Sequence, residues 1–262
     1  MRDLVADQLM ALMEAGSGRA DTDRAQLMLA WGYPERSWKD IAALPIGVRD
    51  TLLFTLRQLL FGNKSKLSCH CPQCQANFEF DADISDILAV TEDVDNAAVG
   101  LPGVSTEGLK VKVGSGYLYL RPLNGRDLSE LPGQLGEDDA VRFLLARAII
   151  SAHNSKGKSV AVPPPGDIKE SWIKASAKAL AKLDPLSVVA FGISCADCNH
   201  EWRVFFDAGQ LLWRELTAEN AATLEEIHLL AKNYGWHEAD IVAIPQARRR
   251  AYANKLSERS ND

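Results

Sequence analysis

Two short cysteine pairs constrain this chain more than any other feature. Cys71-Pro-Gln-Cys74 and Cys195-Ala-Asp-Cys198 are both C-x-x-C pairs, a spacing that lets two thiolates on one tight turn face the same metal ion. A short alternating run rich in aromatic residues follows each pair, over 77–81 and over 201–207. We therefore expect a turn followed by a strand, twice, which is the layout of the two halves of a zinc ribbon.

The separation between the two pairs is unusual, because residues 75–194 lie between them. Pairs within a local zinc module are typically about 15–20 residues apart. If Cys71, Cys74, Cys195 and Cys198 bind one Zn²⁺ ion, the metal joins distant parts of the chain. Four thiolates leave no coordination position for water or substrate, so we expect one structural zinc per chain that contributes folding energy.

Other interpretations of the same residues stay open. Each pair could form a disulfide, or the four thiols could simply be buried. The start of the chain argues against disulfides, because no apolar signal segment precedes the first predicted helix and cytosolic proteins rarely contain disulfides. Cys69, His70 and His200 adjoin the pairs, and any of them could replace a ligand or contact one.

Composition indicates an ordinary globular protein. The chain has 262 residues, of which 47% are hydrophobic and 24% are charged. No apolar run reaches the length of about 18–20 residues that a membrane span needs, so we expect no membrane association. The net charge of −6 argues against a dedicated nucleic-acid binder, which would normally carry a basic stripe. Charge is uneven, with an acidic stretch over 79–95 and a basic C-terminal segment.

The order of segments predicts an α+β fold in which helical N- and C-terminal lobes are joined by a zinc-ribbon-like β unit with an α/β insert. We expect these segments to form one interdependent globular unit. The predicted segments are an N-terminal helical lobe (1–66), the first half of the ribbon (67–82), an α/β insert (83–186) with a hairpin over 109–121, the second half of the ribbon (187–207) and a C-terminal helical lobe (208–262).

Periodicity and capping residues place the individual elements within these segments. The acidic loop is expected after a helical turn at 84–90, and a polar linker over 153–167. Helices are predicted over 3–15, 21–31, 38–44 and 45–60, from Asn124 or Asp127, from Asp138 or Asp139 to about 149, over 167–183, from Asp207, over 237–242 and after Pro245, with further strands over 109–113, 117–121 and 187–193.

The sequence contains no arrangement typical of a catalytic site. Gly157-Lys158-Ser159 resembles the end of a phosphate-binding loop, but position 152, where the first glycine would stand, is Ala152. Glu226-Ile227-His228 lacks the second histidine that a zinc protease needs. We therefore expect no enzymatic activity and no small-molecule substrate.

A consecutive set of landmarks runs through both ends of the chain. The landmarks are Asp23-Arg24-Ala25, Leu44-Pro45-Ile46-Gly47-x-Arg49, Leu60-Phe61-Gly62, Cys71-Pro72-x-Cys74, Cys195-x-x-Cys198-Asn199-His200-Glu201-Trp202, Phe206-Asp207, Leu212-Trp213-Arg214-Glu215, Glu226 to Ala231, Tyr234-Gly235-Trp236 and Arg248-Arg249-Arg250-x-Tyr252. Their shared order resembles the baseplate proteins of T-even-type contractile phage tails. It is most similar to the baseplate hub assembly chaperones of tailed phages and extracellular contractile injection systems. The pair Cys69-His70 departs from that pattern.

The resemblance implies a role in building a tail baseplate, as an assembly factor or as a structural component. Its implied partners are other baseplate hub, spike or wedge proteins, and its implied location is the cytoplasm of the bacterial host during assembly. Arg248, Arg249, Arg250 and Tyr252 share one predicted helix and are our candidate partner surface. Two other functions stay open: a zinc-ribbon adaptor that contacts nucleic acid, and an enzyme whose site is not recognised.

Overall fold

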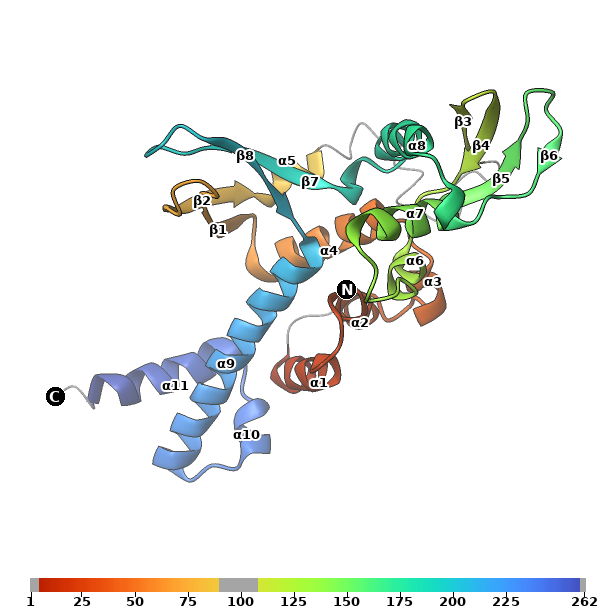
Figure 1. Cartoon of the computed structure of the whole chain (residues 1–262). Coiled ribbons are helices and arrows are strands. Elements are labelled where there is room, and N and C mark those ends of the chain that lie inside the picture. Colours follow the sequence, from red (N-terminus) through yellow and green to blue (C-terminus); the bar gives the residue numbers. More distant parts are fainter. Residues whose placement is uncertain (1–4, 90–107, 260–262) are drawn as a thin grey trace. The chain divides into compact units, whose positions relative to one another are not determined.

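The computed structural model describes residues 5–89 and 108–259, and it confirms the predicted α+β class (Figure 1). The chain divides into two compact units. Unit 1 consists of Met1–Glu35 and Gly209–Asp262, and unit 2 consists of Arg36–Ala208. The acidic loop that we predicted after the helical turn at 84–90 lies outside the described residues. No helix in the described ranges is long and apolar enough to cross a lipid bilayer.

Unit 1 is helical in the part that the structure describes. Its elements are α1 (Ala6–Gly16), α2 (Asp21–Gly32), α9 (Ala208–Tyr234, from Gly209 on), α10 (Glu238–Val242) and α11 (Gln246–Arg259). One core cluster joins the last three helices through Ile227, Leu230, Ile241 and Leu256. Gly16 lies against Trp213, and a Cβ atom at this position would be 2.2 Å from the indole ring. The N-terminal helix α1 therefore packs on α9 at a point where only glycine fits.

Helices of unit 2 follow the predicted positions closely. They are α3 (Trp38–Ala42), α4 (Ile46–Phe61), α5 (Ile84–Ala89), α6 (Gly125–Ser129), α7 (Glu137–Ala148) and α8 (Glu170–Leu183). Of the two predicted starts of α6, Asn124 is the cap, and it forms a capping box with Asp127. Asp127 is fully buried and accepts hydrogen bonds from the guanidinium groups of Arg121 and Arg147. Burial opposes its ionisation, but these hydrogen bonds lower the pKa of Asp127 below its ordinary value.

The start of α4 contains a buried polar cluster. Asp184 accepts a 2.9 Å hydrogen bond from the backbone N–H of Gly47, and Arg49 donates a 2.7 Å hydrogen bond to Asp50. A Cβ atom at Gly47 would be 2.0 Å from a carboxylate oxygen of Asp184, so glycine is required for this close approach. The cluster ties the first turn of α4 to the short 3₁₀ helix at Pro185–Ser187.

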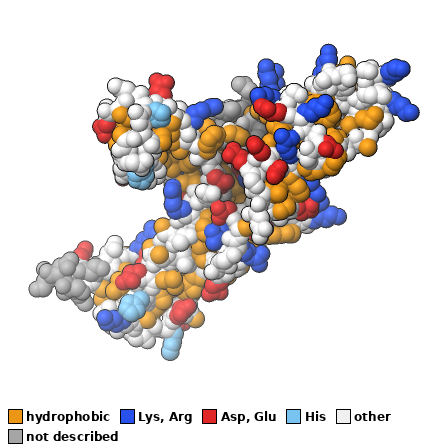
Figure 2. Space-filling view, in the orientation of Figure 1, with side chains coloured by type: hydrophobic (Ala, Val, Ile, Leu, Met, Phe, Trp, Pro, Cys, Tyr) orange, Lys and Arg blue, Asp and Glu red, His pale blue; other side chains and the backbone are white. Residues whose placement is uncertain are grey.

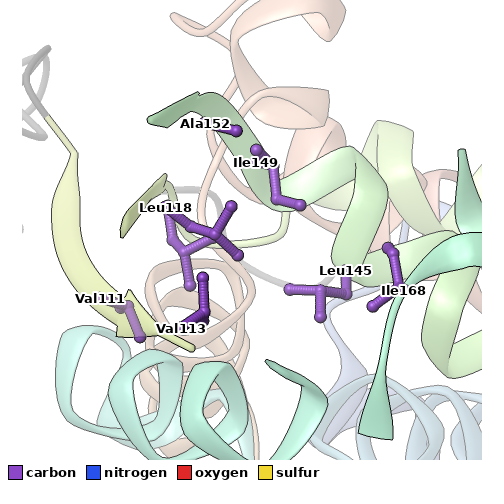
Figure 3. Packing of buried hydrophobic residues seen from close by; sticks show 8 residues of the cluster. Val111, Val113, Leu118, Leu145, Ile149, Ala152 and Ile168 are labelled. Atoms are coloured by element: carbon purple, nitrogen blue, oxygen red, sulfur yellow. The ribbon is translucent and has the colours of Figure 1, made fainter. Parts of the chain in front are cut away.

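A four-stranded antiparallel sheet forms the insert, with the order β3-β4-β5-β6. Its strands are β3 (Leu109–Val113), β4 (Gly116–Leu120), β5 (Ile149–His153) and β6 (Ser159–Val160). The hairpin of β3 and β4 was predicted, whereas β5 and β6 lie where we predicted the end of a helix and a linker. Figure 3 shows the core between this sheet and the helices of the insert, formed by Val111, Val113, Leu118, Leu120, Leu145, Ile149, Ala152 and Ile168.

Two separate two-stranded hairpins complete unit 2. The first pairs β1 (Lys64–His70) with β2 (Asn77–Asp83), and the second pairs β7 (Val189–Ser194) with β8 (Glu201–Phe206). Both hairpins are antiparallel and in regular register. We predicted β2, β7 and β8 but not β1, which shows only weak alternation of apolar residues. Each hairpin turn contains one C-x-x-C pair.

Candidate metal centre

The first hairpin turn holds Cys71 and Cys74 through local backbone hydrogen bonds. The N–H of Cys71 donates to the carbonyl of Ala76, and the N–H of Gln75 donates to the carbonyl of Cys71, both at 2.9 Å. Gln75 adopts a left-handed backbone conformation with φ of 62°. This residue reverses the chain directly after the second cysteine, so that both thiols lie on one side of the turn.

The second hairpin turn repeats this arrangement residue for residue. The N–H of Cys195 donates to the carbonyl of His200, and the N–H of Asn199 donates to the carbonyl of Cys195, again both at 2.9 Å. Asn199 has φ of 56°, the same left-handed conformation as its counterpart in the first turn. Two hairpins that are far apart in sequence therefore have the same local structure and present their cysteines in the same way.

The structure brings the four predicted ligands together. The Sγ atoms of Cys71, Cys74, Cys195 and Cys198 all lie within 4.8 Å of one another. Cys71 Sγ is 3.7 Å from Cys198 Sγ, and Cys74 Sγ is 3.5 Å from Cys195 Sγ. A disulfide has its sulfurs about 2.0 Å apart, so these four cysteines are free thiols. Tetrahedral coordination with metal–sulfur bonds of about 2.3 Å places neighbouring sulfurs about 3.8 Å apart, which these distances match.

The thiols at this site differ in how readily they ionise, because the pKa is lowered for Cys71 and raised for Cys74 and Cys198. Burial opposes the ionisation of Cys71, but hydrogen bonds from the backbone N–H groups of Cys74 and Gln73 and from the thiols of Cys198 and Cys74 together lower the pKa of this thiol to about 7. Cys198 accepts from the backbone N–H of His200, yet desolvation and the three neighbouring sulfurs raise its pKa to about 12. Four such sulfurs cannot all carry negative charge beside one another without a cation. The donor set therefore fits a divalent metal ion.

Cys69, His70 and His200 do not belong to this group. Among the described residues, the His, Cys, Asp and Glu side chains that could share one metal ion are the four cysteines of the turns. Cys69 is the second-last residue of β1, two residues before Cys71, and its pKa is raised by burial and by the nearby Cys71. The ring of His200 stacks on Trp202, with centroids 6.1 Å apart. The candidate metal ligands among the described residues are therefore the four cysteine sulfurs.

Aromatic side chains join the two hairpins below the sulfur cluster. Phe78 of β2 contacts Trp202 of β8 edge to face, and Phe80 contacts Phe191 of β7 in the same way, each with centroids 5.9 Å apart. Phe206 of β8 lies 5.7 Å from Phe191 and stacks on Phe54 of α4. These contacts hold the hairpins at a fixed separation beneath the sulfurs. The alternating aromatic runs after each cysteine pair were the sequence signal for this packing.

The four residues of the predicted partner surface on α11 differ in their exposure to solvent. Arg249 is 2% exposed and forms a 2.6 Å ion pair with Glu226 of α9. Arg250 bonds to Glu226 and to Glu219, whereas Arg248 is exposed and has no ion pair among the described residues. Tyr252 packs edge to face on Trp236, with centroids 5.4 Å apart. Arg249 and Tyr252 thus stabilise unit 1, and Arg248 and Arg250 are the members of this set that reach solvent.

Sequence reasoning missed the two acidic partners of these arginines. Glu219 and Glu226 lie seven residues apart on α9, two helical turns along the same face, opposite the arginines of α11. That spacing was the available signal, but only the folded structure brings the two helices together. No family model, curated protein or solved structure gives a significant match to the chain.

Proposed function

We propose that this protein is a non-enzymatic assembly factor or structural component of a contractile-tail baseplate, and that a structural Zn²⁺ ion at Cys71, Cys74, Cys195 and Cys198 holds its ribbon together. The observation that carries the metal proposal is the convergence of four sulfurs within 4.8 Å. Zinc suits an all-thiolate tetrahedral site, because it is borderline soft and has no geometric preference of its own.

The sulfur site supports a structural rather than a catalytic role for the metal. Four protein sulfurs complete a tetrahedron, so water and substrate have no position on the ion. The ligands come from hairpins in distant parts of the chain, so metal binding and the folding of unit 2 are linked. When bound, the ion would offset two of the four thiolate charges and fix the two turns against each other. The function then depends on the surfaces that this fold presents.

The baseplate proposal rests on the ordered sequence landmarks, several of which contact one another within unit 1. Arg24, from a landmark near the N-terminus, lies over the ring of Trp213, from a landmark in α9, at 4.9 Å. Tyr234 and Trp236 stack with centroids 4.8 Å apart, and Tyr252 completes this aromatic cluster. Landmark residues from separate segments thus pack on one another and form part of the fold of unit 1.

Co-purification tests the assembly role. A tagged form of the full chain is expressed in the bacterial host together with the remaining tail proteins, and the recovered proteins are identified by mass spectrometry. We expect hub, spike or wedge proteins to be recovered with the wild-type chain and in lower amounts with Cys195→Ser, which removes one metal ligand. Repeated recovery of a folded, zinc-containing bait without any tail protein would contradict the proposed role.

A further inference from the structure

The face of the β3–β6 sheet opposite to the core has a distinct composition. Core residues of β3 and β4 alternate with Lys110, Lys112, Tyr117 and Tyr119, which therefore project from the other face. His153 of β5 is directly opposite Tyr117 in the register, and Ser151 is opposite Tyr119. We call this set the lysine–tyrosine face: Lys110, Lys112, Tyr117, Tyr119, Ser151 and His153.

Charge is segregated in this part of the chain. Residues 108–121 and 149–160, which form the strands and turns of the sheet, contain four lysines and one arginine but no Asp or Glu, although the chain as a whole has a net charge of −6. Arg121 is paired with Asp127. The four lysines of these strands and turns are exposed, and among the described residues none of them forms an ion pair: Lys110, Lys112, Lys156 and Lys158. Figure 2 shows Lys and Arg side chains projecting around the part of unit 2 that holds these strands.

Contacts within the lysine–tyrosine face hold its side chains in place. The ammonium group of Lys110 lies 4.2 Å from the ring centroid of Tyr117. The ring of Tyr119 contacts His153 edge to face, with centroids 5.2 Å apart. His153 also forms hydrogen bonds with Ser151 Oγ and with the carbonyl of Gly157. Side chains that are already ordered lose less conformational entropy when a partner binds. Lys110 and the rings of Tyr119 and His153 are therefore preorganised.

We propose that the lysine–tyrosine face binds an acidic polypeptide segment of a partner protein. Carboxylates complement Lys110 and Lys112, which both project from β3 on the face opposite to the core, so an acidic segment can lie across this face of the sheet. Single-stranded nucleic acid fits less well, because base stacking needs free aromatic faces. Lys110 already covers Tyr117, and His153 contacts Tyr119.

This inference deepens the proposed assembly function, because it names the chemistry of one partner surface. It can be tested without knowing the partner. Fluorescence anisotropy is measured on the purified, zinc-containing full chain with a labelled oligoglutamate peptide, and separately with an oligothymidylate of equal charge. We expect the peptide to bind more tightly than the oligothymidylate, with an affinity that falls as salt concentration rises.

Matched variants assign the binding to this face. The double variant Lys110→Gln and Lys112→Gln should weaken peptide binding by about tenfold, because two of the exposed cations are lost. Lys178→Gln with Lys182→Gln removes the same charge from exposed positions on α8 and should change affinity by less than about twofold. The charge-preserving pair Lys110→Arg and Lys112→Arg should bind as wild type does. Circular dichroism and thermal unfolding check that each variant is folded.

Several outcomes would overturn the inference. Equal weakening in both glutamine variants would mean that the peptide responds only to overall charge. Undetectable peptide binding at low salt would contradict the proposal. The lysines would then be explained as charges that prevent the edge strand of the described sheet, β3, from pairing with another chain. Tighter binding of the oligothymidylate would point to nucleic acid instead. Each of these results leaves the baseplate role to be decided separately by co-purification of the unmodified chain.

Discussion

Gln75 and Asn199 occupy equivalent positions in the two cysteine turns. Each directly follows the second cysteine of its pair, and each adopts a left-handed backbone conformation, with φ of 62° and 56°. The N–H of each donates a 2.9 Å hydrogen bond to the carbonyl of the first cysteine. The two residues differ chemically, however, because asparagine tolerates the left-handed region much better than glutamine does.

This difference predicts unequal effects of glycine substitution. Gln75→Gly should raise the free energy of unfolding by about 0.5–1 kcal/mol, because glycine removes the strain of the left-handed conformation. Asn199→Gly is the matched control and should change stability by less than about 0.5 kcal/mol. Denaturant unfolding of the zinc-bound proteins measures both values. A larger gain at Asn199 than at Gln75 would contradict this explanation of the turns.

Much of the metal site could be predicted from sequence because its determinants are local. A C-x-x-C pair and an alternating strand behind it are read directly from neighbouring residues, and both were recognised at Cys71 and Cys195. The packing that brings the two turns together depends on aromatic contacts such as Phe78 with Trp202. Those contacts join residues that are far apart in the sequence. Local patterns therefore predicted each half of the ribbon but not the packing between the two halves.

The parts that sequence reasoning missed have identifiable physical causes. β5 begins at Ile149, immediately after α7, so its apolar residues continue the helical periodicity of the preceding segment. A register shift between Tyr119 and Leu120 leaves Ile150 exposed and interrupts the alternation expected of a strand. The burial of Arg249 depends on Glu226, which belongs to a different helix. A run of three arginines therefore indicated a solvent-exposed surface when one of them is internal.

The metal centre predicts a sharp contrast between neighbouring cysteines. Purified protein should contain one zinc ion per chain by mass spectrometry. Cys71→Ser should abolish stoichiometric zinc binding and lower the free energy of unfolding of unit 2 by about 3 kcal/mol or more. Cys69→Ser lies two residues away, outside the sulfur group, and should keep the zinc and cost less than about 1 kcal/mol.

Cobalt substitution gives an independent test of the same site. Co²⁺ bound by four thiolates should produce intense sulfur-to-metal charge-transfer absorption in the wild type and in Cys69→Ser, and a weaker, altered spectrum in Cys71→Ser. Affinity should fall as pH falls, since protons compete with the metal for four thiolates. Full stability of the wild type after complete removal of metal with a chelator would disprove the structural role.

The buried ion pair of unit 1 predicts a large cost for removing one partner. Glu226→Gln should lower the free energy of unfolding by about 3–5 kcal/mol, because Arg249 would remain buried without a balancing charge. Glu225→Gln changes the adjacent, exposed residue and should have an effect of less than about 0.5 kcal/mol. Hydrogen exchange of α9 and α11 amides measures the loss within unit 1 itself. Similar protection in the two variants would show that the pair contributes little.

Asp50 predicts an unusual pH dependence of stability in unit 2. Burial raises the pKa of Asp50 to about 6, against the opposing effect of Arg49, and the carboxylates of Asp207 and Asp184 add to the increase. In the unfolded chain this carboxyl group should titrate near about pH 4. Between these two values the folded protein binds more protons than the unfolded chain does. The contribution of Asp50 to stability is therefore fully present below about pH 4 and is lost as pH rises through about 6.

The difference between variants isolates this contribution from the other groups that titrate in the same range, including the cysteine ligands. Relative to wild type, Asp50→Asn should gain stability as pH is raised from about 4 to about 6.5, by on the order of 2 kcal/mol, because the variant no longer carries a buried carboxyl group that must ionise. Asp81→Asn, at an exposed position on β2, should show no such trend. Denaturant unfolding across this pH series, at saturating zinc, supplies both curves. A flat difference for Asp50→Asn, or one of opposite sign, would mean that Arg49 keeps Asp50 ionised throughout.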